Sequence, residues 1–184
     1  ERNKVCFSIM DGIKNFKYKI IPNLLDEKEI FLLKEYCKNK HIGNQKNFDI
    51  NQNNCGDTYF YKDELMEVIL KSKKEIIEKE IGVELNETYT FWRCYTYGAE
   101  LTKHTDRPSC EISATVFIDS DDTEWPIFMG GKSVSLNKGD AVIYKGCDVE
   151  HWREPFNGDY HMQVFLHYVD KHGKYSDYKG DVKR

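Results

Sequence analysis

The sequence predicts an α+β fold, in which N-terminal helices support either a β-sandwich or a double-stranded β-helix of the jelly-roll type. Two observations lead to this prediction. Over residues 1–86 the apolar residues recur mainly at helical spacing, whereas over residues 87–170 short β-rich segments alternate with turn signals such as Gly130-Gly131 and Asn157-Gly158. The chain has 184 residues and no internal repeat, so a single domain spanning residues 1–184 is the economical organisation.

The first half of the chain is predicted to provide helical support. Residues 16–21 alternate between apolar and polar and predict a short strand. Apolar spacing predicts one helix from Asp26 and a second over about 63–81, which ends at Gly82. The polar stretch 41–57, rich in Asn and Gln, is predicted to be a loop.

The second half is predicted to consist of strands joined by tight turns. We expect strands near residues 88–97, 110–119, 125–129, 132–136, 140–145, 148–153 and 160–169. The segment 171–184 is polar, and we expect this tail to fray.

Composition limits the classes of function. The net charge is -4 and the lysines are dispersed, so no basic surface for nucleic acid is indicated. The six cysteines include no C-x-x-C pair, which argues against a structural zinc site and favours reduced thiols. No membrane span or secretion signal is visible, and we expect a cytoplasmic protein, although a start at Glu1 is compatible with a piece of a longer chain. The oligomeric state leaves no signal in the sequence.

The residues that indicate chemistry begin with His104-Thr105-Asp106. If the preceding aromatic and β-branched run forms a strand, His104 and Asp106 project from the same face. Two ligands hold a metal weakly, and His151 is the candidate third. Two imidazoles and a carboxylate form the facial triad of Fe(II), which leaves positions open for a cosubstrate and O2. Since His-x-Asp is common by chance, a hydrogen-bonded structural cluster is the alternative.

Arginine is unevenly distributed. The three arginines away from the termini, Arg93, Arg107 and Arg153, all lie in the region of the candidate ligands, and lysine supplies most of the positive charge elsewhere. A guanidinium binds a carboxylate as a planar fork. If this distribution is not chance, an anionic ligand is expected near the metal.

Three motifs occur in a characteristic order. They are Tyr95-x-x-Gly98-x-x-Leu101-x-x-His104-x-Asp106, the segment Leu136 to Tyr144, and His151 followed by the strand His161 to Asp170. In this order they resemble the Fe(II)- and 2-oxoglutarate-dependent oxygenases, in particular the prolyl 4-hydroxylase-like branch. The resemblance covers roughly Thr88 to Asp170.

This resemblance implies a jelly-roll, cupin-like core and an iron site. Fe(II) would be held by His104, Asp106 and His151, with 2-oxoglutarate as cosubstrate, O2 as oxidant and ascorbate as reductant. The implied reaction hydroxylates a C–H bond of a peptidyl substrate, with prolyl residues as one candidate, or of a small molecule, and it releases succinate and CO2. A non-catalytic cupin-like domain that binds a metal or another ligand is the alternative.

One position departs from the family pattern. Such hydroxylases usually place Lys or Arg nine or ten residues after the last metal ligand, to bind the far carboxylate of 2-oxoglutarate, and here the tenth residue is His161. A neutral imidazole is a poor sole counter-ion for a carboxylate. Arg153 lies two residues after His151 and faces the same way in a strand. We therefore predict that Arg153 supplies the guanidinium and that His161 is a second contact.

Five further residues are candidates for the pocket. Tyr95 occupies the tyrosine position of the family motif and is expected to line the cosubstrate site. Ser113 and Thr115 share one strand face and are candidate hydrogen-bond donors to 2-oxoglutarate. Arg107 and Arg93 are candidates for the substrate rim, although the favoured roles are a pair with an acid in its own loop for Arg107 and a structural ion pair for Arg93.

Overall fold

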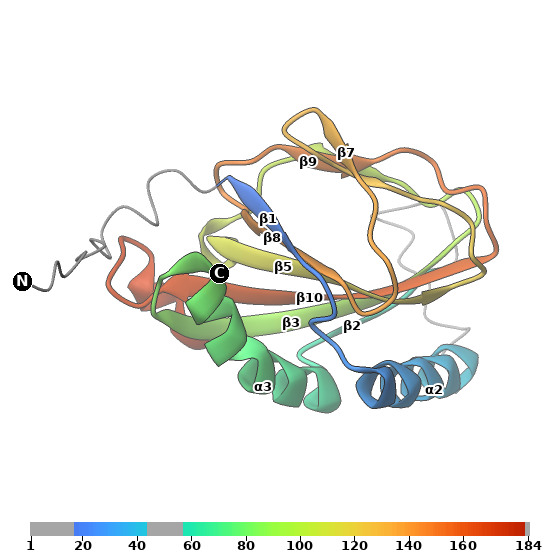
Figure 1. The fold of residues 1–184 in the computed structure, drawn as a ribbon, viewed down its shortest axis with the longest axis horizontal. Coiled ribbons are helices and arrows are strands. Elements are labelled where there is room, and N and C mark those ends of the chain that lie inside the picture. The colour runs from blue at the N-terminus through green and yellow to red at the C-terminus, as the bar shows by residue number, and fades with distance from the viewer. Residues whose placement is uncertain (1–16, 44–56, 183–184) are drawn as a thin grey trace, which may run out of the picture.

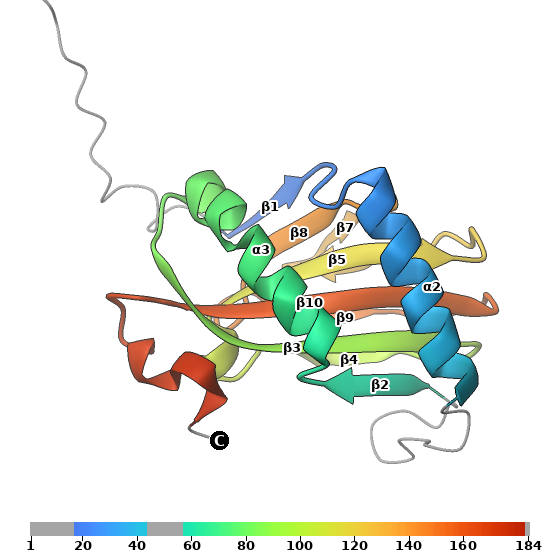
Figure 2. The ribbon, with the colours of Figure 1, turned by 90° about the horizontal axis from the view of Figure 1, so that it is seen from below.

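The computed structural model describes residues 17–43 and 57–182. Two antiparallel sheets face each other, and two helices cover the outer face of the larger sheet (Figure 1). Figure 2 shows both helices lying across the strands of this sheet. This is the jelly-roll architecture with helical support that the sequence predicts. None of the described helices is long and apolar enough to cross a membrane.

The strands are arranged in a six-stranded and a four-stranded sheet. The larger sheet has the order β1 (Tyr18–Ile21), β8 (Ala141–Lys145), β5 (Ile112–Ser120), β10 (Tyr160–Asp170), β3 (Leu85–Thr96) and β2 (Thr58–Tyr61). The smaller sheet has the order β4 (Leu101–His104), β9 (His151–Arg153), β6 (Ile127–Met129) and β7 (Lys132–Val134). All neighbouring strands pair antiparallel.

The two helices bury the apolar outer face of the larger sheet. Helix α2 (Glu27–Gly43) precedes β2, and α3 (Glu64–Ile81) precedes β3. The Asp63 side chain caps α3 by accepting hydrogen bonds from two backbone N–H groups of its first turn. Gly82 ends the helix in the left-handed conformation, with φ 71°. The resulting core leaves the opposite, inner face of the sheet for the functional residues.

Along the central strands, the side chains that point inward differ chemically from the apolar side chains that face the helices. On β10, Met162, Val164 and Leu166 belong to the core beneath the helices. The intervening positions, His161, Gln163, Phe165 and His167, are also buried, although three of these four side chains carry polar groups. Buried polar side chains on the inner face indicate an interior built to bind a ligand rather than only to pack.

Several sequence expectations need correction. Strands β2 and β4 were not predicted, because each is short and follows a turn-rich or polar stretch. The predicted strand 148–153 forms only over His151–Arg153, since the preceding residues turn the chain into position. Helix α2 continues to Gly43 through the start of the predicted loop 41–57, and residues 44–56 of that loop lie outside the described residues.

The predicted fraying of the tail is also wrong for most of its length. Residues Ser176–Asp181 form the 3-10 turn η3 against the larger sheet. Asp181 is buried and forms an ion pair with Arg107 at 2.8 Å. Its carboxylate also accepts a hydrogen bond from Tyr61 Oη at 2.5 Å. The polar composition of the tail led us to expect exposure. Asp181 can be buried because Arg107 and Tyr61, which are distant in sequence, neutralise its charge and bind its carboxylate.

Candidate metal centre

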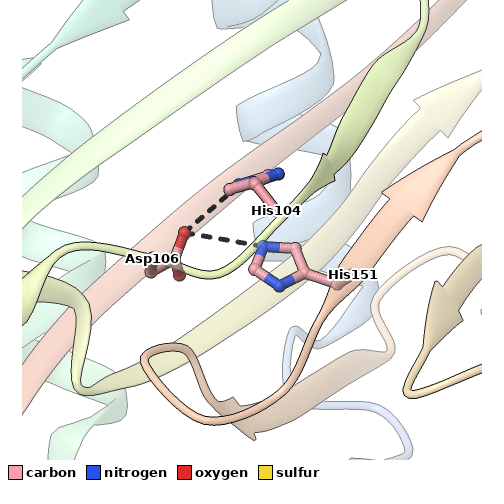
Figure 3. Close-up of side chains that lie close together, drawn as sticks. All are labelled: His104, Asp106 and His151. Carbon is pink, nitrogen blue, oxygen red and sulfur yellow. Dashed lines mark ion pairs between the residues drawn. The ribbon is translucent and has the colours of Figure 1, made fainter.

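Three side chains converge where β4 and β9 pair. His104 ends β4 and lies opposite His151, which begins β9. Asp106 lies just beyond β4, and its Oδ1 is 3.4 Å from His104 Nε2 and 3.5 Å from His151 Nε2 (Figure 3). One donor atom from each residue lies within 4.8 Å of the other two. The structure therefore brings together all three predicted ligands, although Asp106 lies in the turn after the strand.

Each imidazole is held by the same local hydrogen bond. His104 Nδ1 lies 2.7 Å from the carbonyl oxygen of Thr102, and His151 Nδ1 lies 2.9 Å from that of Val149. A carbonyl only accepts, so each Nδ1 carries the proton and donates. In the neutral ring Nε2 then has a free lone pair that points toward Asp106. This orientation is typical of histidines that bind metals.

Ser113 supports the carboxylate. Its Oγ lies 3.1 Å from Asp106 Oδ2, 3.1 Å from the carbonyl oxygen of Cys110 and 2.8 Å from His167 Nδ1. A hydroxyl donates one hydrogen bond, and an ionised carboxylate is the stronger of the two acceptors. We infer that Ser113 donates to Asp106 and accepts from His167. The sequence proposed Ser113 as a cosubstrate contact, and in the structure its hydroxyl contacts Asp106 and His167.

The charges of the cluster suit a divalent cation. Burial raises the pKa of Asp106, but hydrogen bonds with His104 and His151 outweigh burial and hold this pKa well below its usual range. The hydrogen bond with Asp106 raises the pKa of His104, against the opposing effect of burial. Burial lowers the pKa of His167 to about 4, so this ring is neutral at pH 7. A carboxylate that stays ionised between two imidazoles can bind a cation in place of their protons.

The three residues lie on a cavity of about 240 Å³ inside the jelly roll. Its wall is largely aromatic and comes from the inner faces of β3, β8 and β10, with Tyr89, Phe91, Arg93, Tyr95, Tyr144, Phe165 and His167. Phe165 and His167, from the predicted strand 160–169, both line this cavity. An open space beside three oriented donors is where further ligands of a metal would bind.

The predicted anchor Arg153 is buried but does not line this cavity. It lies with His161 on a second cavity of about 360 Å³. Arg153 Nη2 donates to Gln163 Oε1 at 2.8 Å, and Nη1 donates to the carbonyl oxygen of Trp125. It makes no ion pair with a carboxylate among the described residues, and burial lowers its pKa to about 10. A buried cation with only neutral partners is costly until an anion binds.

Other cosubstrate candidates also face the interior. Tyr95 is fully buried on the metal cavity, and its hydroxyl makes no hydrogen bond within the described chain. His161 is 4% exposed, and neither ring nitrogen is hydrogen-bonded within the same residues. Thr115 Oγ1 lies 3.4 Å from Tyr144 Oη. Buried polar atoms without partners are rare in folded proteins and indicate space for a ligand.

The sequence favoured an ion pair for both candidate rim arginines, and both form one, but Arg107 pairs with a residue of the C-terminal tail rather than with an acid in its own loop. Arg93 is buried, pairs with Asp57 and lies over the Tyr95 ring, while still lining the metal cavity. Arg107 pairs with Asp181 and lies over the Tyr89 ring at 4.7 Å. Neither Asp57 nor Asp181 could be assigned from the sequence, because each lies tens of residues from its partner.

Gln163 is the main residue that the sequence reasoning missed. It lies on the inward face of β10, two residues after His161, and it is 0% exposed. The inward phase of His161 was the available signal, because alternation along the strand places Gln163 on the same face. Gln163 holds Arg153 from across the barrel.

Comparisons with known proteins agree with this architecture. No protein-family model matches the sequence, and a search of curated proteins finds no match. Among solved structures, a prolyl-4-hydroxylase of Pseudomonas putida aligns with a TM-score of 0.67 and 15% identity, over 88% of this chain and 97% of that chain. A prolyl hydroxylase of Trichoplax adhaerens, in complex with a peptide fragment of the hypoxia inducible factor oxygen degradation domain, aligns with a TM-score of 0.65 and 13% identity, over 89% and 88%.

A third similar structure has a different activity. The non-heme alpha-ketoglutarate-dependent carbocyclase SnoK, from nogalamycin biosynthesis, aligns with a TM-score of 0.68 and 15% identity, over 84% of this chain and 79% of that chain. At such identities the similarity establishes a shared fold. The chemistry of this chain has to be argued from its own residues.

Proposed function

We propose that the chain is a non-haem Fe(II)- and 2-oxoglutarate-dependent dioxygenase that hydroxylates a C–H bond and releases succinate and CO2. The observation that carries this proposal is the cluster of His104, Asp106 and His151, whose two imidazoles are each oriented by a backbone carbonyl. The solved structures named above support it, since their printed activities include 2-oxoglutarate-dependent reactions on this fold.

The donor set fits Fe(II). Two imidazole nitrogens and one carboxylate oxygen would occupy one face of an octahedral Fe(II), and all three residues border the 240 Å³ cavity. When bound there, iron would supply activation of O2 and chelation of the 2-oxo acid. The protein holds the three donors on one side and leaves the cavity side open for these ligands.

We further propose that Arg153 anchors the far carboxylate of 2-oxoglutarate. Along β9 it lies two residues after His151, a step of roughly 6.6 Å in a strand. Tyr95 adds a free hydroxyl on the metal side of Arg153. A dicarboxylate that reached past Tyr95 would neutralise Arg153 and accept the hydrogen bond of this hydroxyl. His161 and Thr115 remain the predicted secondary contacts.

The aromatic wall of the metal cavity would exclude water from the reacting groups. Tyr144 lies against the His151 ring at 4.7 Å between ring centroids, and Tyr89 lies against His167 at 4.5 Å. A dry surrounding protects a reactive oxidant and strengthens the electrostatic contacts with the cosubstrate. The chain itself needs no further acid or base for such a reaction.

The substrate is proposed to be a peptide or a small molecule that approaches over β2 and β3. An open groove lined by Tyr61, Tyr89, Phe91 and Arg107 adjoins the metal cavity and shares Tyr89 and Phe91 with it. Aromatic grooves bind extended and proline-containing peptides as well as planar rings. A prolyl residue is therefore one candidate for the hydroxylated group, and ascorbate is the proposed reductant.

An uncoupled turnover assay tests this function. The protein is incubated with Fe(II), ascorbate and 2-oxoglutarate, and succinate is measured. We expect succinate from the wild-type chain and none from His104→Ala, with His172→Ala as a matched control at an exposed histidine. A protein that binds the metal but never consumes 2-oxoglutarate would instead be the non-catalytic cupin-like domain.

A further inference from the structure

The interior of the jelly roll contains two cavities, and Arg153 lies at their boundary. His151 lines the metal cavity, whereas Arg153, two residues later on the same strand, lines the second. On β10, Phe165 lines the metal cavity, His161 lines the second, and Gln163 lies between them on the same face. Gln163 and Arg153 are hydrogen-bonded, so they lie together at the boundary between the two spaces.

The second cavity has a polar floor that lacks partners. Neither ring nitrogen of His161 is hydrogen-bonded within the described chain, and the same holds for Arg153 Nε. The His161 ring stacks on Phe117 with an interplanar angle of 2° and meets Trp125 edge-on, so it is fixed in position. The floor therefore offers one cation and one oriented imidazole to a single ligand.

The walls of this cavity suit a short aliphatic chain. Phe117, Trp125, Val134 and Leu136 line part of it, and the rest of the lining is mostly polar and includes Asp122, Glu124 and Lys138. Its volume of about 360 Å³ exceeds the 240 Å³ beside the metal. A lysine or arginine at position 161 would occupy part of this room, because both side chains are longer than that of histidine.

We propose that the second cavity receives the distal end of a 2-oxo diacid longer than 2-oxoglutarate, and that the chain accepts 2-oxoadipate as a cosubstrate. This inference rests on the proposed function. The 2-oxo acid end would bind beside His104, Asp106 and His151, and the additional methylene would carry the distal carboxylate further into the second cavity than that of 2-oxoglutarate. That carboxylate would accept hydrogen bonds from Arg153 and His161 on the side of the second cavity.

The reaction balances in the same way as with 2-oxoglutarate. C1 of 2-oxoadipate leaves as CO2, and one oxygen atom of O2 joins the keto carbon to give glutarate. The second oxygen atom enters the C–H bond of the substrate. Without substrate, it is reduced to water by two electrons from ascorbate, with uptake of two protons.

Binding and turnover are measured separately. A pocket without spare room discriminates against one extra methylene by roughly 10-fold or more. Anaerobic calorimetric titration of the Fe(II) protein should give Kd values for 2-oxoadipate and 2-oxoglutarate that differ by less than about 10-fold. In air, glutarate should form from 2-oxoadipate. If 2-oxoadipate bound more than about 10-fold more weakly than 2-oxoglutarate, while 2-oxoglutarate still gave succinate, this inference would be overturned and the proposed function would stand.

Substitutions at Leu136 test the place of binding. This side chain lines the second cavity and is only partly buried, so we expect the fold to accommodate a larger residue. Leu136→Trp should raise the ratio of the 2-oxoadipate Kd to the 2-oxoglutarate Kd at least about 10-fold, whereas Leu136→Ala should leave the ratio equal or lower. An unchanged ratio in a folded Leu136→Trp protein would contradict the assignment to this cavity. If this variant does not fold, the wild-type comparison decides alone. If the wild-type chain turned over neither 2-oxoadipate nor 2-oxoglutarate, the proposed function itself would be refuted.

Discussion

Gly146 lies directly against the carboxylate of Asp106. A Cβ at position 146 would lie 2.9 Å from the Cβ of Asp106 and closer still to Asp106 Oδ2 and the carbonyl oxygen of Cys110. The backbone reinforces this contact, because Asp106 N donates to the carbonyl oxygen of Gly146 at 2.8 Å. The turn after β8 therefore positions a predicted metal ligand that precedes it by forty residues in the chain.

Gly146→Ala should damage the metal centre more than the fold. The new methyl group meets a backbone oxygen and the ligand itself, so Asp106 has to move, and overpacking of this kind costs about 1–3 kcal/mol. We expect weaker Fe(II) binding and a lower melting temperature, measured by metal titration and calorimetry. Gly43→Ala is the control, because a Cβ there has no atom within 4 Å. Equal metal affinity in both variants would refute the positioning role of Gly146.

Ser113→Ala should weaken metal binding without abolishing it. The substitution removes the hydroxyl that donates to Asp106 Oδ2 and accepts from His167. Loss of an outer hydrogen bond to a ligand typically costs 10–100-fold in metal affinity, and we expect a decrease of about that size. The Kd for Fe(II) or Co(II) in each variant is the measurement.

Thr115→Val is the matched control for Ser113→Ala. Both residues lie on the inner face of β5, but the Thr115 hydroxyl contacts Tyr144 rather than a predicted ligand. Its metal affinity should stay within about threefold of wild type, since no outer hydrogen bond to a ligand is lost. A similar loss of metal affinity in both variants would mean that disturbance of β5, and not the bond to Asp106, is responsible.

The contrast between Asp106 and Arg153 shows how far the sequence could predict the site. The convergence of His104, Asp106 and His151 was predictable because these residues belong to local motifs whose strands meet in a jelly roll of this order. Alternation along the strand correctly placed Arg153 in the interior. It did not predict which cavity Arg153 lines, because the positions of its partners Gln163 and Trp125 depend on the packing of distant strands. Asp181 was missed altogether, since an isolated carboxylate in a polar tail gives no sign of its partner.

Arg153→Met should weaken 2-oxoglutarate binding while preserving the fold. Methionine keeps much of the buried apolar volume, and replacing a buried charge by an apolar residue is often neutral for stability. We expect the Kd for 2-oxoglutarate to rise at least about 10-fold, because hydrogen bonds to a charged group contribute roughly 1.5–3 kcal/mol each. Anaerobic titration measures this Kd, and thermal unfolding monitors stability.

His161→Phe separates the two contacts proposed for the carboxylate. The ring would keep its stacking on Phe117, but its hydrogen-bonding nitrogens would be lost. We expect a smaller loss of affinity than in Arg153→Met, because an imidazole without charge binds a carboxylate less strongly than a guanidinium. Unchanged 2-oxoglutarate affinity in Arg153→Met would refute the anchor, whatever the effect of His161→Phe.

Asp181→Asn should destabilise the protein at neutral pH and much less in acid. Burial raises the pKa of Asp181, but hydrogen bonds from Arg107, Tyr61 and Ser109 outweigh it and lower this pKa to about 2. Because the folded pKa lies below the ordinary carboxyl value, the stabilisation is fully present above about pH 4 and is lost as the pH falls through about 2. At pH 7 it should amount to about 1–2 kcal/mol, reduced by the partial exposure of Arg107.

Denaturant unfolding at pH 7 and at pH 3 measures this effect in Asp181→Asn, Arg107→Gln and the double variant. At pH 7 the two single substitutions should be non-additive, since they remove the same ion pair, and the coupling should shrink at pH 3. Additive effects at both pH values would mean that the tail is not held by this pair. Because Arg107 follows Asp106 directly, loss of the pair should also loosen the metal ligand, and the Kd for Fe(II) should rise in Asp181→Asn even though the substitution lies 75 residues from Asp106 in the sequence.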